Sequence, residues 1–235
     1  MTGTRVGEGH EPLEYRTVAR PAVVETVIRR SRFITHVQPV SSREEAEAWI
    51  AEVAARHARA THNVPAYIVG LRGELRWCSD AGEPAGTAGR PVLEVLEREG
   101  LTQVAVVVTR YFGGVKLGAA GLVRAYAACC AAGVAAARPG TCVRGRRLVL
   151  HVPYGHYGAV RHALDGGAAL VLDERFAEQA TLQVWVPETR AAELYDRLVE
   201  LSAGAVRPEE TGYEYRIWPP LPEQPPSPAT GVHRG

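Results

Sequence analysis

The sequence predicts an α+β chain of two domains, and three observations support that fold class. The apolar run Val104–Val108 has the pattern of a strand buried on both faces, and Gly113 and Gly114 separate it from the alanine-rich stretch 117–137, which is typical of a helix. The triplet Arg138-Pro139-Gly140 then breaks the chain. After this break the strand and helix patterns follow a new order, which indicates a second domain.

Residues 17–138 are predicted to form the first domain, whereas residues 1–16 lack periodicity and are predicted to be disordered. Ser42 and Glu45 have the spacing of a capping box, in which both side chains satisfy free amides at the start of a helix. The apolar positions that follow recur every three or four residues, as in a helix that packs on a sheet. Alternation and turn signals predict the other elements, namely strands at 23–27, 33–40, 64–71 and 74–78 and a helix at 92–98.

The second domain is predicted at residues 142–217. Its patterns indicate a strand at 143–152, a helix at 154–164, strands at 168–172 and 181–186, a helix at 188–201 and a strand at 206–217. This βαββαβ order is the ferredoxin-like plan. From residue 218 to residue 235 repeated prolines oppose both helices and sheet ladders, so a disordered, proline-rich tail is expected.

Composition excludes several classes of protein. The formal net charge of +1 differs from that of the strongly basic domains that coat nucleic acids, so any anion site has to be local. The four cysteines lack metal-binding spacing and are predicted to be reduced, buried thiols. The N-terminus has no signal-peptide core, and no apolar run of about eighteen residues occurs, so we expect a cytoplasmic protein without a membrane span.

A basic stripe beside the glycine turn is the first candidate site. Lys116, Ala120 and Arg124 are four residues apart, so a helix would place the two cations on one face and roughly 12 Å apart. Cations and free amides at the start of a helix bind phosphate or carboxylate groups. The alternative is a solvated helix face next to a glycine turn that serves packing.

Polar residues upstream form a second group of candidates. Asp80 and Glu83 lie in the irregular loop 79–91, where they either orient a water molecule or cation as weak catalytic candidates or brace the loop by accepting amides and pairing with arginines. His62 directly precedes a strand, where it either reaches a shared cleft or caps the strand. His57 and His62 are five residues apart, which does not match a helical metal site, and no metal is predicted.

Known nucleotide and catalytic motifs are absent from the sequence. There is no G-x-x-x-x-G-K-[ST] phosphate loop and no G-x-G-x-x-G fingerprint, so we expect no nicotinamide and no other cofactor. Neither a nucleophile elbow nor a catalytic Cys/His pair is visible. A binding protein is therefore favoured over an enzyme.

The first 140 residues or so resemble the YigZ/IMPACT family. The resemblance is carried by YFGGVKLG at 111–118, SRFI at 31–34, His62-Asn63, and SDAGEPAGTAGRP at 79–91, although Ala81 and Ala85 replace an acidic residue and a serine that the family often has. It implies a ribosomal protein S5 domain 2-like first domain, and a small ferredoxin-like second domain as in bacterial members. For the eukaryotic IMPACT relatives it implies regulation of translation under stress.

These observations lead to one functional expectation and one alternative. We expect a bacterial binding or regulatory protein linked to translation through RNA, the ribosome or a protein partner. Its anion-binding cleft would use Arg110, Lys116 and Arg124, with Arg32, Arg90 and His62 as neighbours, around a turn built on Gly113, Gly114, Gly118 and Gly121. The alternative is a hydrolase or transferase that acts on small molecules or phosphoesters, with Asp80, Glu83, Lys116 and Arg124 in its active site.

Overall fold

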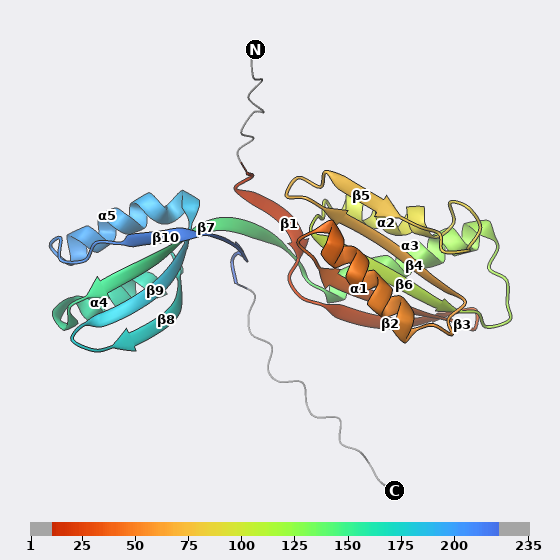
Figure 1. Cartoon of the computed structure of the whole chain (residues 1–235), viewed down its shortest axis with the longest axis horizontal. Coiled ribbons are helices and arrows are strands. Elements are labelled where there is room, and N and C mark those ends of the chain that lie inside the picture. Colours follow the sequence, from red (N-terminus) through yellow and green to blue (C-terminus); the bar gives the residue numbers. More distant parts are fainter. Residues whose placement is uncertain (1–10, 221–235) are drawn as a thin grey trace, which may run out of the picture.

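Two antiparallel sheets organise the chain, one in each lobe of an elongated molecule (Figure 1). The structure is a computed structural model that describes residues 11–220. The first-lobe sheet has the order β2-β3-β6-β4-β5. Its strands are β2 (Ala22–Ile28), β3 (Ser31–Pro39), β6 (Val104–Tyr111), β4 (His62–Val69) and β5 (Leu75–Cys78).

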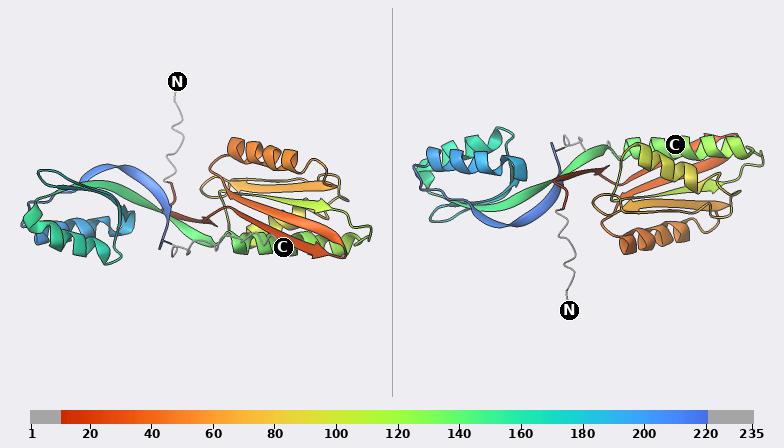
Figure 2. Two further views of the ribbon diagram at one scale, coloured as in Figure 1. Left: turned by 90° about the horizontal axis from the view of Figure 1, so that it is seen from below. Right: turned by 90° about the horizontal axis from the view of Figure 1, so that it is seen from above.

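Helices cover both faces of this first sheet (Figure 2). Helix α1 (Arg43–Arg56) lies on one face, and helices α2 (Gly89–Arg98) and α3 (Ala119–Ala136) lie on the other. Strand β6 is central and its residues 104–110 are buried, as the apolar run predicted. The cap of α1 is confirmed, since Ser42 Oγ accepts the Glu45 amide at 3.2 Å, but the Glu45 carboxylate reaches back to the Ser41 amide at 2.7 Å.

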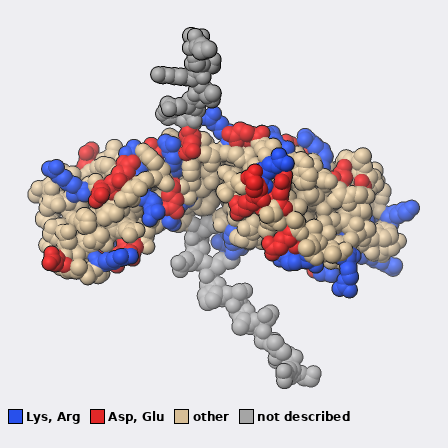
Figure 3. Space-filling view, viewed as in Figure 1, with Lys and Arg blue, Asp and Glu red and all other residues tan. Residues whose placement is uncertain are grey.

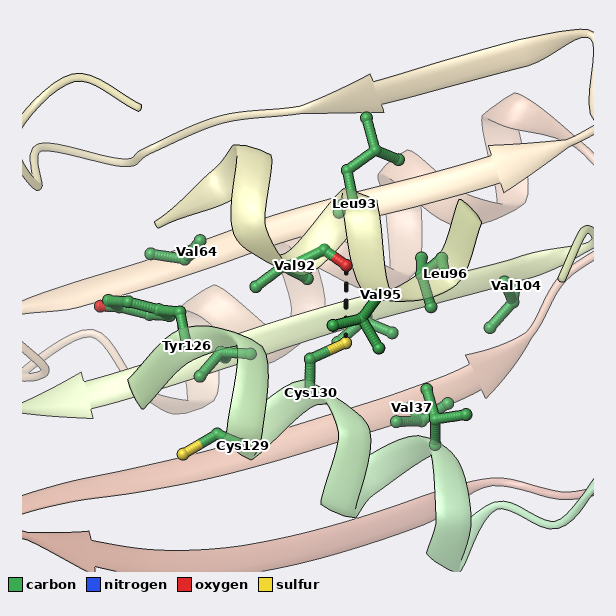
Figure 4. Close-up of a cluster of buried hydrophobic side chains, with 14 of the residues drawn as sticks. Val37, Val64, Val92, Leu93, Val95, Leu96, Val104, Tyr126, Cys129 and Cys130 are labelled. Carbon is green, nitrogen blue, oxygen red and sulfur yellow. Dashed lines mark hydrogen bonds between the residues drawn. The ribbon is translucent and has the colours of Figure 1, made fainter. Parts of the chain in front are cut away.

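The main core lies between the sheet and helices α2 and α3 (Figure 4). Cys130 of α3 donates a weak hydrogen bond to the Val92 carbonyl of α2 at 3.6 Å, and burial raises the pKa of this thiol to about 12. Gly133 permits close packing of α3 on β3, because a Cβ atom there would lie 2.5 Å from Thr35 Cγ2. By length and composition alone α3 could cross a membrane, but it contributes seven buried residues to this first domain.

The second lobe has the ferredoxin-like topology. Its strands lie in the order β10-β7-β9-β8, all neighbours antiparallel, which is the 4-1-3-2 arrangement of a βαββαβ unit. Helices α4 and α5 pack on one face of this sheet (Figure 2). The elements are β7 (Pro139–Val152), α4 (Tyr154–Asp165), β8 (Leu170–Phe176), β9 (Ala180–Pro187), a short 3₁₀ turn η1 (Glu188–Arg190), α5 (Ala191–Leu201) and β10 (Glu209–Ile217). The predicted fold class is therefore confirmed.

The start of the chain differs from its prediction. Residues 14–16 are not disordered, because strand β1 (Glu14–Val18) pairs with residues 139–143 of β7 and so extends the sheet of the second lobe. Strand β7 begins inside the predicted break, at Pro139, directly after Arg138, and the boundaries 17–138 and 142–217 stay a prediction. The expected disorder of residues 1–10 lies outside the described residues.

The predicted disorder of the tail is also wrong for its first residue, Trp218. The Trp218 amide donates to the Thr141 carbonyl at 2.9 Å, and its ring lies 5.3 Å from the Trp185 ring, measured between centroids. The backbone amide and the large apolar ring of Trp218 thus both attach this residue to the second lobe. The expectation for 221–235 lies outside the described residues.

Candidate functional site

Three neighbouring strands place one row of side chains on the α3 side of the first sheet. Arg110 of β6 pairs in register with Phe33 of β3 and with His62 of β4. Residues in register across a sheet point to the same face, so these three side chains lie side by side. The row sits at the end of β6, where the chain enters the glycine loop.

Arg110 is the centre of a buried polar network. Its Nη1 donates to Glu83 Oε1 at 2.6 Å, and the Tyr126 hydroxyl of α3 donates to the same oxygen at 2.7 Å. The side chains of Arg110 and Glu83 are only 6% and 3% exposed, so the two charges compensate each other away from water. Burial, together with the hydrogen bond to Glu83, raises the pKa of Tyr126 and keeps its hydroxyl protonated.

Two aromatic rings hold the Arg110 guanidinium between them. Its central carbon lies 5.6 Å from the Phe33 ring centroid and 5.4 Å from the Phe112 ring centroid. Both distances are within the range of cation–π contacts. Arg110 Nη2 also approaches Ser31 Oγ at 3.4 Å. Arg110 is thus immobilised by charge, hydrogen bonds and stacking.

His62 lies next to the same network, and its hydrogen bond shows which ring nitrogen carries the proton. Its Nδ1 lies 2.9 Å from the Ala81 carbonyl oxygen, and since a carbonyl only accepts, Nδ1 carries the proton of this bond. Its Nε2 lies 3.7 Å from Glu83 Oε2, and the side chain is 18% exposed. His62 therefore connects the buried network to solvent.

The glycine loop after β6 depends on missing side chains. A Cβ atom on Gly113 would lie 1.9 Å from the Arg30 carbonyl oxygen, and the Gly113 amide donates to Ser31 Oγ at 3.3 Å. Gly114 and Gly118 have φ values of 84° and 72°, which favour glycine. Gly121 differs, because it lies inside the first turn of α3.

Helix α3 starts later than the sequence pattern predicted. It begins at Ala119, and its capping residue Gly118 offers no side chain to the first amides. Lys116 precedes the helix, so the prediction that Lys116 and Arg124 share one helix face is wrong. The positive φ of Gly118 explains the delay, because that backbone conformation is not helical.

A cleft of about 440 Å³ lies where the row, the loop and the start of α3 meet. His62 and Arg110 line it from the sheet, Glu83 lines it from the loop 79–91, and Phe112, Lys116 and residues 117–119 line it from the glycine loop and the start of α3. Figure 3 shows basic side chains that project from the end of the first lobe where this loop lies. The structure thus brings together three of the six predicted cationic residues.

The other three predicted cations lie elsewhere. Arg124 lines a neighbouring hollow of about 230 Å³ with Arg29, and Leu117 separates the two hollows by lining both. Arg32 lies on the α1 face of the sheet, over the Tyr111 ring at 5.2 Å, because adjacent strand residues point to opposite faces. Arg90 is on α2 and pairs with Glu94 and Glu97 at 2.9 and 3.4 Å.

The two candidate carboxylates have different surroundings. Asp80 accepts amides from Gly86, Ala88 and Gly89 at 2.8 to 3.0 Å and so holds the loop 79–91 together. Burial alone would raise the pKa of Asp80, but these three hydrogen bonds outweigh it and lower the pKa. Glu83 instead anchors Arg110. Within residues 11–220 no three His, Cys, Asp or Glu side chains gather as a metal site would require.

Several residues of the site were not identified from the sequence as its members. Tyr126, Ser31 and Phe112 hold Arg110 in place, but Tyr126 lies 43 residues from Glu83 along the chain. His57 contacts His36 and Tyr111 on the opposite face of the sheet, at 3.1 and 2.9 Å, rather than His62. Such contacts depend on strand register, which local sequence patterns do not determine.

The fold and the cleft define a two-domain α+β protein with a loop-lined pocket on its first domain and a ferredoxin-like second domain. The Impact N-terminal domain matches residues 29–134, and a domain of unknown function, DUF1949, matches residues 150–205. The chain belongs to the IMPACT family, as its resemblance to YigZ/IMPACT proteins predicted.

Relatives and a solved structure match most of the chain. The IMPACT family member YvyE of Bacillus subtilis is 36% identical over 81% of this chain and 88% of its own length. The IMPACT family member YigZ of Escherichia coli is 34% identical over 80% of this chain and 94% of its own. A crystal structure of a hypothetical protein, 29% identical, superposes with a TM-score of 0.55 over 84% of this chain and 97% of its own.

Proposed function

We propose that this protein binds RNA, and that its cleft holds a phosphate group of the RNA strand. The observation that carries the proposal is the convergence of Lys116, His62 and the start of α3, which has no side-chain cap, on one cleft. Free amides at a helix start and a nearby cation are the elements from which proteins build phosphate sites.

The charge balance of the cleft favours an anion. Among the described residues that line the cleft, one is acidic, Glu83, and Arg110 compensates its charge at a distance of 2.6 Å. Within residues 11–220 no acidic side chain lies within ion-pair distance of Lys116. The partial positive charge of the α3 start adds to the lysine. The uncompensated charge of the cleft is therefore positive.

The same geometry supports binding over catalysis. Asp80 accepts three backbone amides, and one Glu83 oxygen accepts Arg110 and Tyr126. A general base has to reach the proton it abstracts, whereas Asp80 is directed at its own loop and Glu83 is held in a buried pair with Arg110. Because the resemblance to the eukaryotic IMPACT proteins implies regulation of translation, we propose that the RNA contact of this protein also serves translation.

RNA binding is tested by titration of a labelled single-stranded RNA at several salt concentrations. The binding constant should fall with salt, and Lys116→Ala should make the slope of log K against log salt shallower by about 0.7 for one lost phosphate contact. Arg90→Ala is the matched control, because Arg90 is an exposed cation of the same domain that is paired to glutamates. Salt-independent binding, or equal effects of both variants, would refute the proposal.

A second measurement uses the fact that Lys116 is the single lysine of the chain. An amine-acetylating reagent should modify Lys116, and saturating RNA should slow this reaction while the N-terminal amine reacts as before. Mass spectrometry of the peptide that contains Lys116 gives both rates. Turnover of phosphoesters in a parallel screen with magnesium, lost in a Glu83→Gln variant that melting curves show to be folded at the assay temperature, would instead establish the enzyme alternative.

A further inference from the structure

An exposed aromatic ring stands at the mouth of the cleft. Phe112 is 46% exposed, although it is a large apolar residue in the middle of a polar site. Its backbone is fixed, because the Phe112 amide donates to Thr61 Oγ1 at 3.0 Å and the next residue is attached to Ser31. An apolar ring that is held in place yet left open to water is a feature of binding surfaces.

The Phe112 ring contacts the Arg110 side chain and is otherwise partly open to water. The Arg110 guanidinium lies 5.4 Å from the ring centroid, and Arg110 itself is held by Glu83 and by the Phe33 ring. Tyr126 in turn donates to Glu83. Phe33, Arg110 and Phe112 thus form a row of contacts that begins in the core, where Phe33 is buried, and ends at the surface. Because Phe33 and Arg110 are buried and Arg110 is held by Glu83, the outermost ring presents a preorganised flat surface.

We propose that Phe112 is a stacking platform for an unpaired base of single-stranded RNA, whose adjacent phosphate lies at Lys116 and the start of α3. This inference rests on the proposed function and names the form of RNA that the cleft accepts. Sites for single strands combine a cationic groove with aromatic rings that stack on bases, and both elements line this cleft.

The same surroundings favour a nucleotide over a protein side chain. An aromatic residue of a partner protein would stack on Phe112 equally well, but it would bring no phosphate for Lys116 and the α3 start. A nucleotide brings a flat base and a phosphate in one unit, and the cleft volume of about 440 Å³ lies in the range of small-ligand sites, about 300–1,000 Å³. Bases in a duplex are stacked on each other, so a duplex offers the phosphate without the base.

The test compares three RNAs of one length: a single strand, its duplex and a single strand of abasic residues. The wild type should bind the normal strand about tenfold or more tightly than the abasic strand, which is the size expected for one stacked base. Phe112→Leu should lose the same factor on the normal strand and nothing on the abasic strand. Phe112→Trp should retain binding, because it keeps a flat aromatic ring.

Two comparisons separate this inference from the proposed function. Phe112→Leu removes no charge, so it should leave the salt slope unchanged, whereas Lys116→Ala should change it. The matched control is Phe176→Leu, since Phe176 is 59% exposed on β8 of the second domain. If Phe112→Leu binds all three RNAs like the wild type while Lys116→Ala weakens them, the stacking inference is wrong and phosphate binding stands.

The remaining outcomes are equally informative. Equal affinity of the wild type for duplex and single strand would overturn the stacking inference. Salt-independent binding of every RNA would overturn the proposed function together with the inference. A melting curve for Phe112→Leu that matches the wild type shows that a loss of affinity does not come from unfolding.

Discussion

Replacing Glu83 by glutamine tests whether the buried pair with Arg110 organises the site. The substitution keeps the shape of the side chain but leaves the Arg110 charge without a counter-charge in a position that is 6% exposed. Breaking a buried ion pair from one side costs about 3–5 kcal/mol. In a chain of this size each kcal/mol lowers the melting temperature by about 2–4 °C, so we expect a loss of roughly 6–20 °C.

The assay is calorimetry at pH 7 on a double-mutant cycle. Glu83→Gln and Arg110→Met should each destabilise strongly, while the double variant should lose less than the sum, because it leaves no unpaired charge. Glu94→Gln is the control, since its exposed pair with Arg90 at 2.9 Å contributes only about 0–1 kcal/mol. A Glu83→Gln variant that melts within a degree of the wild type, or strictly additive variants, would refute this account.

Three further predictions follow from the same contacts. Asp80→Asn should lower stability at pH 7 as measured by urea unfolding. Because the pKa of Asp80 is lowered in the folded state, the difference in stability between wild type and variant should vanish as acid protonates the wild-type carboxylate. Burial, together with the neighbouring His57, lowers the pKa of His36 from 6.5 to about 4, so the unfolded state binds a proton more readily than the folded state. The wild type should therefore lose stability as the pH falls from 6.5 to 4. His36→Gln should reduce this dependence of unfolding free energy on pH. Gly113→Ala should destabilise, since its Cβ would lie 1.9 Å from a carbonyl oxygen, whereas Gly158→Ala inside α4, with open space around it, should stabilise by about 0.5–1 kcal/mol in thermal melts.

Local patterns predicted the elements better than the site. The buried run of β6, the Ser42 cap and the βαββαβ order were all readable, because each depends on residues close in sequence. The membership of the cleft depends on which strands pair and in which register. Arg110 and Arg32 were grouped by their motifs, yet they lie on opposite faces of the sheet.

Some errors had a signal in the sequence. Arg90 has glutamates four and seven residues ahead on its helix, and this spacing predicts the ion pairs that occupy it. Gly118 lies directly before Ala119, and glycine readily adopts non-helical backbone angles, so the helix begins after it. Lys116 therefore lies outside α3. The contact of Tyr126 with Glu83 had no such signal, because it joins a helix to a distant loop.

The pairing of β1 with β7 has a consequence for the order of synthesis. Strand β1 leaves the ribosome about 120 residues before its partner, which at about 5–20 residues per second leaves it unpaired for roughly 6–24 s. An unpaired strand is an aggregation hazard, and charged residues on it reduce that hazard. Glu14 and Arg16 supply these charges, so the nascent strand can stay soluble until residues 139–143 emerge and pair with it.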